Sequence, residues 1–352
     1  KFIMAYTTIK KPSDYFNTKL YTGNGSASRS ITGVGFQPDW VWVKSRSATY
    51  YHALWDVVRT NKSALYSNTT DAEDTGTGGT LGSFNSDGFT LPNESGGFVN
   101  NNGTTYASWN WLGANGTAAN TDGDIASTVS ANTTSGFSIV SYTGTGANAT
   151  VGHGLGSAPK MIIVKKTNTT ANWGVYHASS GNTKYQLLNG NYADTIESTA
   201  WNNTSPTSSV FSVGSWNESN ASGSTYIAYC FAEKQGYSKF GSYLGNGNVN
   251  GTFVYTGFKP AFVIRKRTSS TGKWIVQDSK RPSSQPFNEK RGELYANDSA
   301  AESSSQYYIM DFLSNGFKNR SVDGEVNGSG SSYIYMAFAE QPLVGDNPAT
   351  AR

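Results

Sequence analysis

The fold is decided by Gly35-Phe-Gln-Pro-Asp-Trp-Val-Trp-Val-Lys44, because the chain contains this stretch three times. It returns as Gly156-Ser-Ala-Pro-Lys-Met-Ile-Ile-Val-Lys165 and as Gly257-Phe-Lys-Pro-Ala-Phe-Val-Ile-Arg-Lys266. In each copy a proline precedes a short apolar run. Proline fits the entrance of a β-strand, where no ladder donor is required, and an apolar run of this length is typical of a buried strand. The stretch therefore predicts one strand that occurs three times.

The sequence around each copy repeats as well. Each copy is preceded by a glycine-rich turn, which reads Tyr21-Thr-Gly-Asn-Gly25, Tyr142-Thr-Gly-Thr-Gly146 or Tyr243-Leu-Gly-Asn-Gly247. Each is followed by an aromatic strand, which reads Tyr106-Ala-Ser-Trp-Asn-Trp111, Tyr226-Ile-Ala-Tyr-Cys-Phe231 or Tyr333-Ile-Tyr-Met-Ala-Phe338. A repeat of roughly 100 to 120 residues is a whole domain rather than one turn of a solenoid. We therefore predict three units, with the following boundaries: an N-terminal arm at 1–16, unit 1 at 17–116, a polar linker at 117–134, unit 2 at 135–237, unit 3 at 238–341 and a C-terminal tail at 342–352.

The composition favours strands and turns over helices. The chain has 39 glycines and 13% aromatic residues but only 14% charged residues, a balance that is poor in helix formers and rich in strand and turn formers. The fold class predicted is all-β, with three tandem β-sandwich domains of the jelly-roll type and extended terminal arms. No run of 18 apolar residues occurs, so we expect no membrane span.

The repeat also tests for catalysis, because a reactive group shared by the units should recur at aligned positions. The three histidines are His52, His153 and His177, and they do not form one column. Asp56 and Asp278 occupy the column of His177. That column could be a polar site or a solvated strand end, and we favour the solvated strand end. The sequence indicates no enzyme, no catalytic residues, no cofactor and no metal site, and a net charge of +3 is too slight to indicate nucleic-acid binding.

Two sets of residues are candidates for binding. Exposed tryptophans and tyrosines in jelly-roll domains can stack on sugar rings. The candidates for glycan stacking are Trp109, Trp201 and Trp216, together with Tyr50 and Tyr51, although most aromatic residues should lie in the core. Arg265 and Arg267 alternate along a strand and so face one side. Together with Lys290 and Arg291 they form a candidate basic contact face, for which a solvated surface balanced by nearby acids is the simpler interpretation.

The opening stretch and the repeated elements resemble a known kind of phage protein. The stretch from Met4-Ala-Tyr-Thr-Thr-Ile-Lys-Lys to Gly25 and the Gly-Phe-x-Pro-Asp-Trp-Val-Trp-Val-Lys motif are similar to a tandem β-sandwich repeat domain of bacteriophage structural proteins. The resemblance covers residues 4–341 and is strongest in unit 1. It implies a tail-fibre or virion-appendage protein, with an extracellular or virion location, and no catalytic residues.

The sequence thus favours a structural protein, a self-assembling subunit of an extracellular fibre, filament or phage virion appendage. We expect its copies to pack through their β-sandwich faces and terminal arms. The partners expected are copies of the chain itself, other virion proteins or surface glycans. The alternative is a carbohydrate-binding module for host recognition on a tail fibre.

Overall fold

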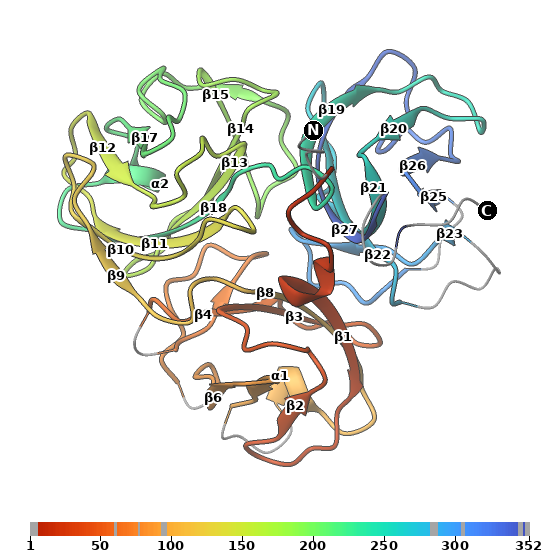
Figure 1. The fold of residues 1–352 in the computed structure, drawn as a ribbon, viewed down its shortest axis with the longest axis horizontal. Coiled ribbons are helices and arrows are strands. Elements are labelled where there is room, and N and C mark those ends of the chain that lie inside the picture. Colours follow the sequence, from red (N-terminus) through yellow and green to blue (C-terminus); the bar gives the residue numbers. More distant parts are fainter. Residues whose placement is uncertain are drawn as a thin grey trace, which may run out of the picture.

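Antiparallel strands form nearly all of the regular structure. The computed structural model describes residues 6–59, 62–76, 78–92, 97–281, 288–303, 307–343 and 348. In these residues three lobes of strands surround a common centre (Figure 1). The predicted all-β class is therefore confirmed. No helix in the described part of the chain is long and apolar enough to cross a membrane.

Each unit contains an inner antiparallel sheet with the same strand order, which confirms the threefold repeat. In unit 1 the order is β1-β8-β3-β4-β5, with bounds β1 (Phe16–Thr22), β8 (Thr105–Trp111), β3 (Trp40–Ser45), β4 (Ala53–Asp56) and β5 (Leu65–Tyr66). The corresponding strands of unit 2 are β11 (Phe137–Thr143), β18 (Thr225–Phe231), β13 (Met161–Lys166), β14 (Trp173–His177) and β15 (Lys184–Leu187), followed by β16 (Thr195–Ile196). Those of unit 3 are β19 (Ser238–Leu244), β27 (Ser332–Pro342), β21 (Phe258–Arg267), β22 (Ile275–Asp278) and β24 (Leu294–Tyr295).

A smaller outer sheet covers the outward face of each inner sheet. The outer sheet of unit 1 consists of β2 (Ser30–Thr32), β7 (Gly88–Thr90) and β6 (Ser83–Asn85), with helix α1 (Gly97–Asn100) beside it. Unit 2 uses β12 (Ala149–Gly152) and β17 (Val210–Val213), with helix α2 (Asn217–Asn220). Unit 3 uses β20 (Phe253–Tyr255), β26 (Gly316–Asn319), β25 (Met310–Leu313) and β23 (Glu289–Lys290). Each unit is thus a two-layer sandwich with its own core.

The inner sheets are buried on both faces, because they also pack on one another. Trp40 and Trp42 of β3 lie in a core that the three units share, whereas Val41 and Val43 face the core of unit 1 alone. The same alternation holds in β13 and β21. Trp40 shows how close the contact is, since its ring lies 4.3 Å from that of Tyr229 in unit 2. Each sheet therefore needs apolar side chains at consecutive positions.

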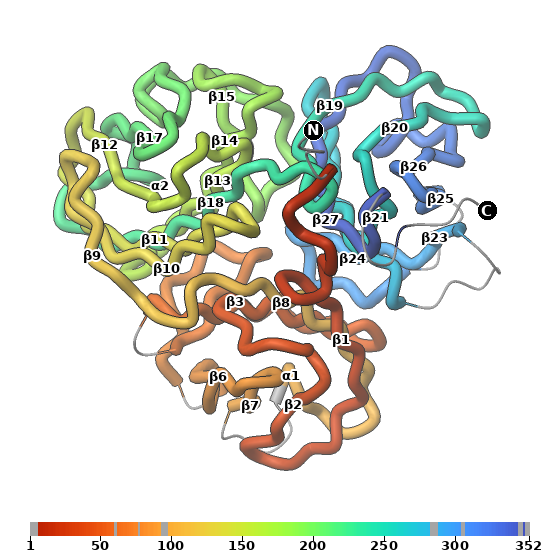
Figure 2. The backbone as a smooth tube through the Cα atoms, in the orientation of Figure 1, coloured from red at the N-terminus to blue at the C-terminus, as the bar shows by residue number. Residues whose placement is uncertain are grey.

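Two of the predicted boundaries need correction. The segment 117–134, predicted as a linker, contributes β9 (Ala118–Asn120) and β10 (Ser127–Asn132), which extend the inner sheet of unit 2. The small side chains of this segment still allow strand pairing, because the edge strand β11 provides the partner for β10. The N-terminal arm also packs on its own chain: Figure 2 shows it crossing from unit 3 to unit 1, and Ile9 lies in the shared core ahead of the 3-10 turn η1 (Pro12–Asp14). Most of the predicted tail at 342–352 lies outside the described residues.

Candidate functional site: polar contacts buried between the units

The lysine that closes each copy of the deciding stretch is buried at a boundary between units. Lys44, Lys165 and Lys266 are each no more than 1% exposed. The ammonium of Lys165 donates to the carbonyl of Thr70 in unit 1 at 3.1 Å. That of Lys266 donates to the carbonyl of Tyr192 in unit 2 at 2.8 Å. Lys44 donates to the adjacent Ser45 carbonyl at 2.8 Å, and its charge is attracted by Asp298 and Glu302 of unit 3.

These contacts follow one rotation around the centre. The lysine of unit 2 contacts unit 1, the lysine of unit 3 contacts unit 2, and the lysine of unit 1 lies against unit 3. Backbone hydrogen bonds connect the same pairs of units. The amides of Glu73, Asp194 and Glu302 donate to the carbonyls of residues 167, 268 and 46 at 2.9, 3.0 and 2.7 Å. The three boundaries are therefore equivalent, and the units close into a ring with pseudo-threefold symmetry.

A second equivalent contact involves ring nitrogens at the start of the fourth inner strand. The indole Nε1 of Trp173 donates to the Tyr66 carbonyl at 3.0 Å, and that of Trp274 donates to the Leu187 carbonyl at 2.8 Å. In unit 1 a histidine replaces the tryptophan, and His52 Nε2 lies 2.8 Å from the Tyr295 carbonyl. Because a buried carbonyl without a donor is costly, each nitrogen stabilises the boundary that it crosses.

The column of Asp56, His177 and Asp278 is buried rather than solvated, so the favoured interpretation of the sequence was wrong. All three side chains are at most 2% exposed. Asp56 accepts from the Tyr229 hydroxyl of unit 2 at 2.9 Å and from the Arg59 guanidinium at 2.7 Å. Strand pairing places these residues at the centre of the ring, where the neighbouring unit excludes water.

The equivalent positions in units 3 and 2 keep the pattern with different groups. Asp278 accepts from Trp109 of unit 1 at 3.0 Å and from Arg281 at 2.6 Å. His177 Nε2 lies 3.2 Å from the Tyr335 carbonyl of unit 3. A buried carboxylate needs a cation and donors, and both aspartates have an arginine three residues later. Unit 2 has a neutral histidine instead and needs neither.

Burial controls the protonation of these groups. Loss of solvent lowers the pKa of Lys44, Lys165 and Lys266 to about 8, and it lowers that of His177 to about 4. Burial alone would raise the pKa of the Asp278 carboxyl, but the Arg281 guanidinium and the surrounding donors hold it below its usual value. The boundaries therefore contain neutral histidine, ionised aspartate and lysines whose charged form is destabilised by burial.

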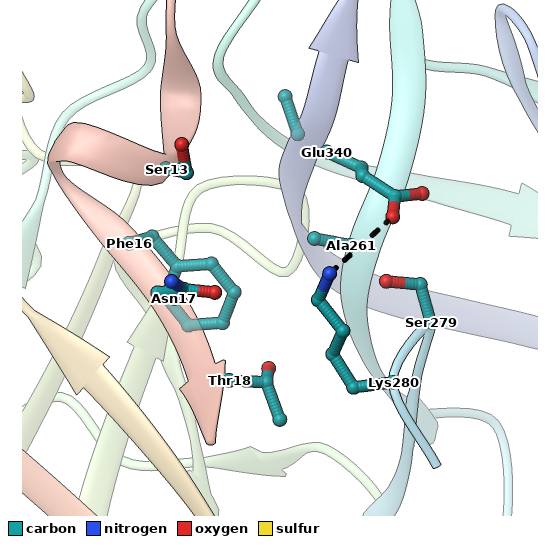
Figure 3. Close-up of a pocket in the computed structure, with 9 residues that line it drawn as sticks. Ser13, Phe16, Asn17, Thr18, Ala261, Ser279, Lys280 and Glu340 are labelled. Carbon is teal, nitrogen blue, oxygen red and sulfur yellow. Dashed lines mark ion pairs between the residues drawn. The ribbon is translucent and has the colours of Figure 1, made fainter. Parts of the chain in front are cut away.

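This cluster recurs in every unit, but its geometry is structural. Its side chains donate to carbonyls and carboxylates of neighbouring units and leave no reacting group facing solvent. The described residues contain no group of three or more His, Cys, Asp or Glu side chains that could hold a metal ion. A hollow beside β1 is lined by Phe16, Asn17 and Lys280, among others (Figure 3), and on its unit 3 side Lys280 lies 4.0 Å from Glu340. Its volume of about 40 Å³ suits water rather than a substrate.

The structure rejects two of the three candidate tryptophans for glycan stacking. Trp109 and Trp201 are at most 1% exposed, because Trp109 lies in the shared core and Trp201 in the core of unit 2. Trp216 is half-buried, and its ring packs 4.4 Å from that of Tyr185.

The candidate basic residues do not form an exposed face. Arg265 is buried, because its guanidinium donates to Asn319, to Gln277 at 2.9 Å and to the Tyr308 carbonyl at 2.9 Å inside unit 3. Arg267, Lys290 and Arg291 are half-buried, and Arg291 pairs with Glu289. Arg265 and Arg267 do share one side of β21, but that side faces the core of unit 3 rather than solvent.

The fold and the contacts between the units define a class of protein. It has three β-sandwich units in one chain, closed into a ring around a shared core. A family model described as a domain of unknown function (DUF7483) matches residues 11–342, and the chain belongs to that family. The match runs through all three units as one domain, in agreement with a single body. Comparison with curated proteins found no match, and comparison with solved structures found none either.

Proposed function

We propose that the chain is a structural protein, a self-assembling subunit of an extracellular fibre, filament or phage virion appendage. The observation that carries this proposal is the location of the repeated residues. The recurring tryptophans, tyrosines, lysines and aspartates lie in cores and boundaries, so the repetition builds a rigid body. A closed ring of sandwiches without a recurrent exposed site suits a building block.

The surface supports a contact between copies on unit 3. Of the nine large apolar side chains that are exposed among the described residues, six belong to unit 3. Three of them, Val249, Tyr307 and Val322, form what we call the unit 3 tip. The buried Asn327 amide donates to the carbonyls of Asn248 and Ser321 at 2.9 and 2.7 Å, which holds the loops of Val249 and Val322 side by side.

The loop of Tyr307 joins the same tip, because the Ser321 hydroxyl donates to the Tyr307 carbonyl. Tyr307 is 66% exposed, Val249 63% and Val322 58%. We take these three exposed apolar side chains, which stand on loops tied together by those hydrogen bonds, as the candidate contact surface. A contact between this tip and a different surface of a second copy is heterologous, and such contacts extend into filaments when they do not close.

Glycan recognition has less support. Two of its three candidate tryptophans are buried, and Trp216 is partly covered by Tyr185. Binding to sugars would have to use exposed tyrosines, such as the candidate Tyr51 or Tyr192. A glycan array with the full chain tests this alternative, and the proposal predicts no binding.

Assembly of the purified full chain tests the structural role. Sedimentation velocity over a range of concentrations, with negative-stain images of the same samples, should show regular assemblies that grow with concentration. A Val249→Asp/Val322→Asp variant should remain monomeric, since charge at the tip opposes apolar contact. The matched control is Ile196→Asp, which adds charge at a 75% exposed position of unit 2 and should assemble normally. A monomeric wild-type chain at every concentration, or equal assembly of the tip variant, would refute the proposal.

A further inference from the structure

Unit 3 has a polar cluster inside its sandwich, at positions where the other two units have core residues. The cluster consists of Arg265 on β21, Gln277 on β22 and Asn319 on β26, each at most 1% exposed. Strand register gives the equivalent residues of the other units, all of which belong to hydrophobic cores: Val43, Trp55 and Leu91 in unit 1, and Val164, Tyr176 and Val213 in unit 2. Unit 3 therefore differs from its neighbours in the middle of its core.

Arg265 is the centre of this cluster. Its guanidinium donates to the side-chain oxygens of Asn319 and Gln277 and to the Tyr308 carbonyl, the last two at 2.9 Å. Burial lowers the pKa of Arg265, because the charged form is poorly solvated there. An apolar side chain would avoid that cost, as it does in units 1 and 2. The buried cation is therefore explained by the groups that it binds rather than by core packing.

One of these groups belongs to the loop of Tyr307 in the unit 3 tip. The carbonyl of the next residue, Tyr308, accepts from Arg265 at 2.9 Å and from the Gln277 amide at 3.2 Å. In unit 1 the loop that enters β6 is held by one side-chain donor, the Trp55 indole, which binds the Gly79 carbonyl at 2.7 Å. Unit 3 thus holds a loop of the tip with two buried side chains.

Asn319 connects Arg265 to the other two loops of the tip. It ends β26, three residues before Val322. Its backbone amide donates to the Thr252 carbonyl at 3.0 Å, and its carbonyl accepts from the Gly251 amide at 3.1 Å. Gly251 and Thr252 follow Val249 in the third loop. A single guanidinium is therefore linked to all three loops that carry the tip side chains.

We propose that the Arg265 cluster fixes the unit 3 tip as a preformed surface for contact with a second copy, an inference that rests on the proposed role of the tip in assembly. Arginine suits this role because its planar fork directs several N–H donors at once, so one side chain can bind groups of separate elements. Buried hydrogen-bond networks rigidify the groups that they join, and ordered loops lose less conformational freedom on association. Arg265 is thus a positioning residue, which acts on the contact through the loops.

A triple variant with an apolar cluster separates positioning from core stability. Arg265→Met, Gln277→Met and Asn319→Leu keep similar side-chain volumes, which cores tolerate best. The unfolding midpoint of this variant in urea should be no lower than that of wild type, because replacing buried charged groups by apolar ones is often neutral or stabilising. A role in core stability alone would instead lower the midpoint.

Hydrogen exchange on monomers, below the concentration of assembly, reads the order of the tip. The amides of Gly251 and Arg320 tie tip loops together, since they donate to the carbonyls of Asn319 and Ile309 at 3.1 and 2.9 Å. In the triple variant both amides should exchange about tenfold faster or more. The matched control is Gln186→Met, which removes a buried amide from unit 2 and should leave both rates unchanged. Unchanged rates in the triple variant would overturn the proposal.

Sedimentation velocity of the same proteins tests the link to assembly. At concentrations where wild type assembles, the triple variant should remain monomeric and Gln186→Met should assemble normally. Equal assembly of the triple variant would overturn the proposal. A wild-type chain that never assembles, together with faster exchange at the tip of the triple variant, would refute the proposed function while supporting the positioning by Arg265, so the two failures are distinguishable.

A single substitution keeps the exchange test available if the triple variant does not fold. Gln277→Met removes one of the two side chains that donate to the Tyr308 carbonyl. The Arg320 amide, which donates to the same loop, should then exchange faster than in wild type. An unchanged rate for this amide would contradict the proposal.

Discussion

Replacing one of the boundary lysines should change how stability depends on pH. In the unfolded chain a lysine has a pKa near 10.4, whereas burial lowers that of Lys165 to about 8. Between these values the unfolded state binds a proton that the folded state does not, so the free energy of unfolding rises with pH. At about 1.36 kcal/mol per unit of pKa, the charge on Lys165 costs the fold roughly 3 kcal/mol at pH 7. About 2 kcal/mol of that cost should disappear between pH 7 and pH 9.5.

The variant Lys165→Met isolates this effect, because methionine fills a similar volume without a charge. We expect urea unfolding, followed by tryptophan fluorescence, to show that wild type gains about 2 kcal/mol over the variant between pH 7 and pH 9.5. Burial raises the pKa of Cys230 and of several tyrosines, which opposes the gain at higher pH, but equally in both proteins. The control is Lys10→Met at an exposed position. Parallel pH profiles for wild type and Lys165→Met would refute the reasoning.

Two further substitutions probe the centre of the ring. Tyr229→Phe removes the hydroxyl that donates to Asp56 across the boundary of units 1 and 2, and calorimetry should show a loss of about 1.5 to 3 kcal/mol, as for hydrogen bonds to charged groups; a loss near zero would mean that the boundary does not hold in solution. Burial lowers the pKa of His177 to about 4, so the unfolded state gains a proton first and stability falls as pH drops from about 6.5 to 4. His177→Gln should flatten that fall in acid titrations monitored by circular dichroism, and an unchanged acid profile would count against it.

The sequence was sufficient for the repeat and the strands but not for the relation between the units. The predicted column of Asp56, His177 and Asp278 is confirmed by register, since they pair with Trp40, Met161 and Phe262. The burial of these residues does not follow from the pattern of one unit, because the second face of each inner sheet is covered by the other units. The signal was present in the deciding stretch: a strand with a solvated face alternates apolar and polar residues, whereas residues 40–43 are all apolar.

The recurrence of the boundary lysines is visible in the sequence, but their burial is not. Lys44, Lys165 and Lys266 end all three copies of the stretch, and a residue that recurs so regularly has a role in each copy. A lysine at a strand end is ordinarily exposed, and no single-chain pattern shows that another unit will cover it. For the same reason Trp109 was a candidate for sugar stacking, although its indole donates to Asp278 of another unit.

The central claim is that the three repeats form one body with a shared core, and scanning calorimetry tests it most directly. Unfolding of the 352 residues should absorb roughly 250 kcal/mol near 60 °C in one transition. The calorimetric and van't Hoff enthalpies should agree, as for a cooperative two-state process. Three resolved transitions, or a calorimetric enthalpy about three times the van't Hoff value, would show three independent domains and contradict the account.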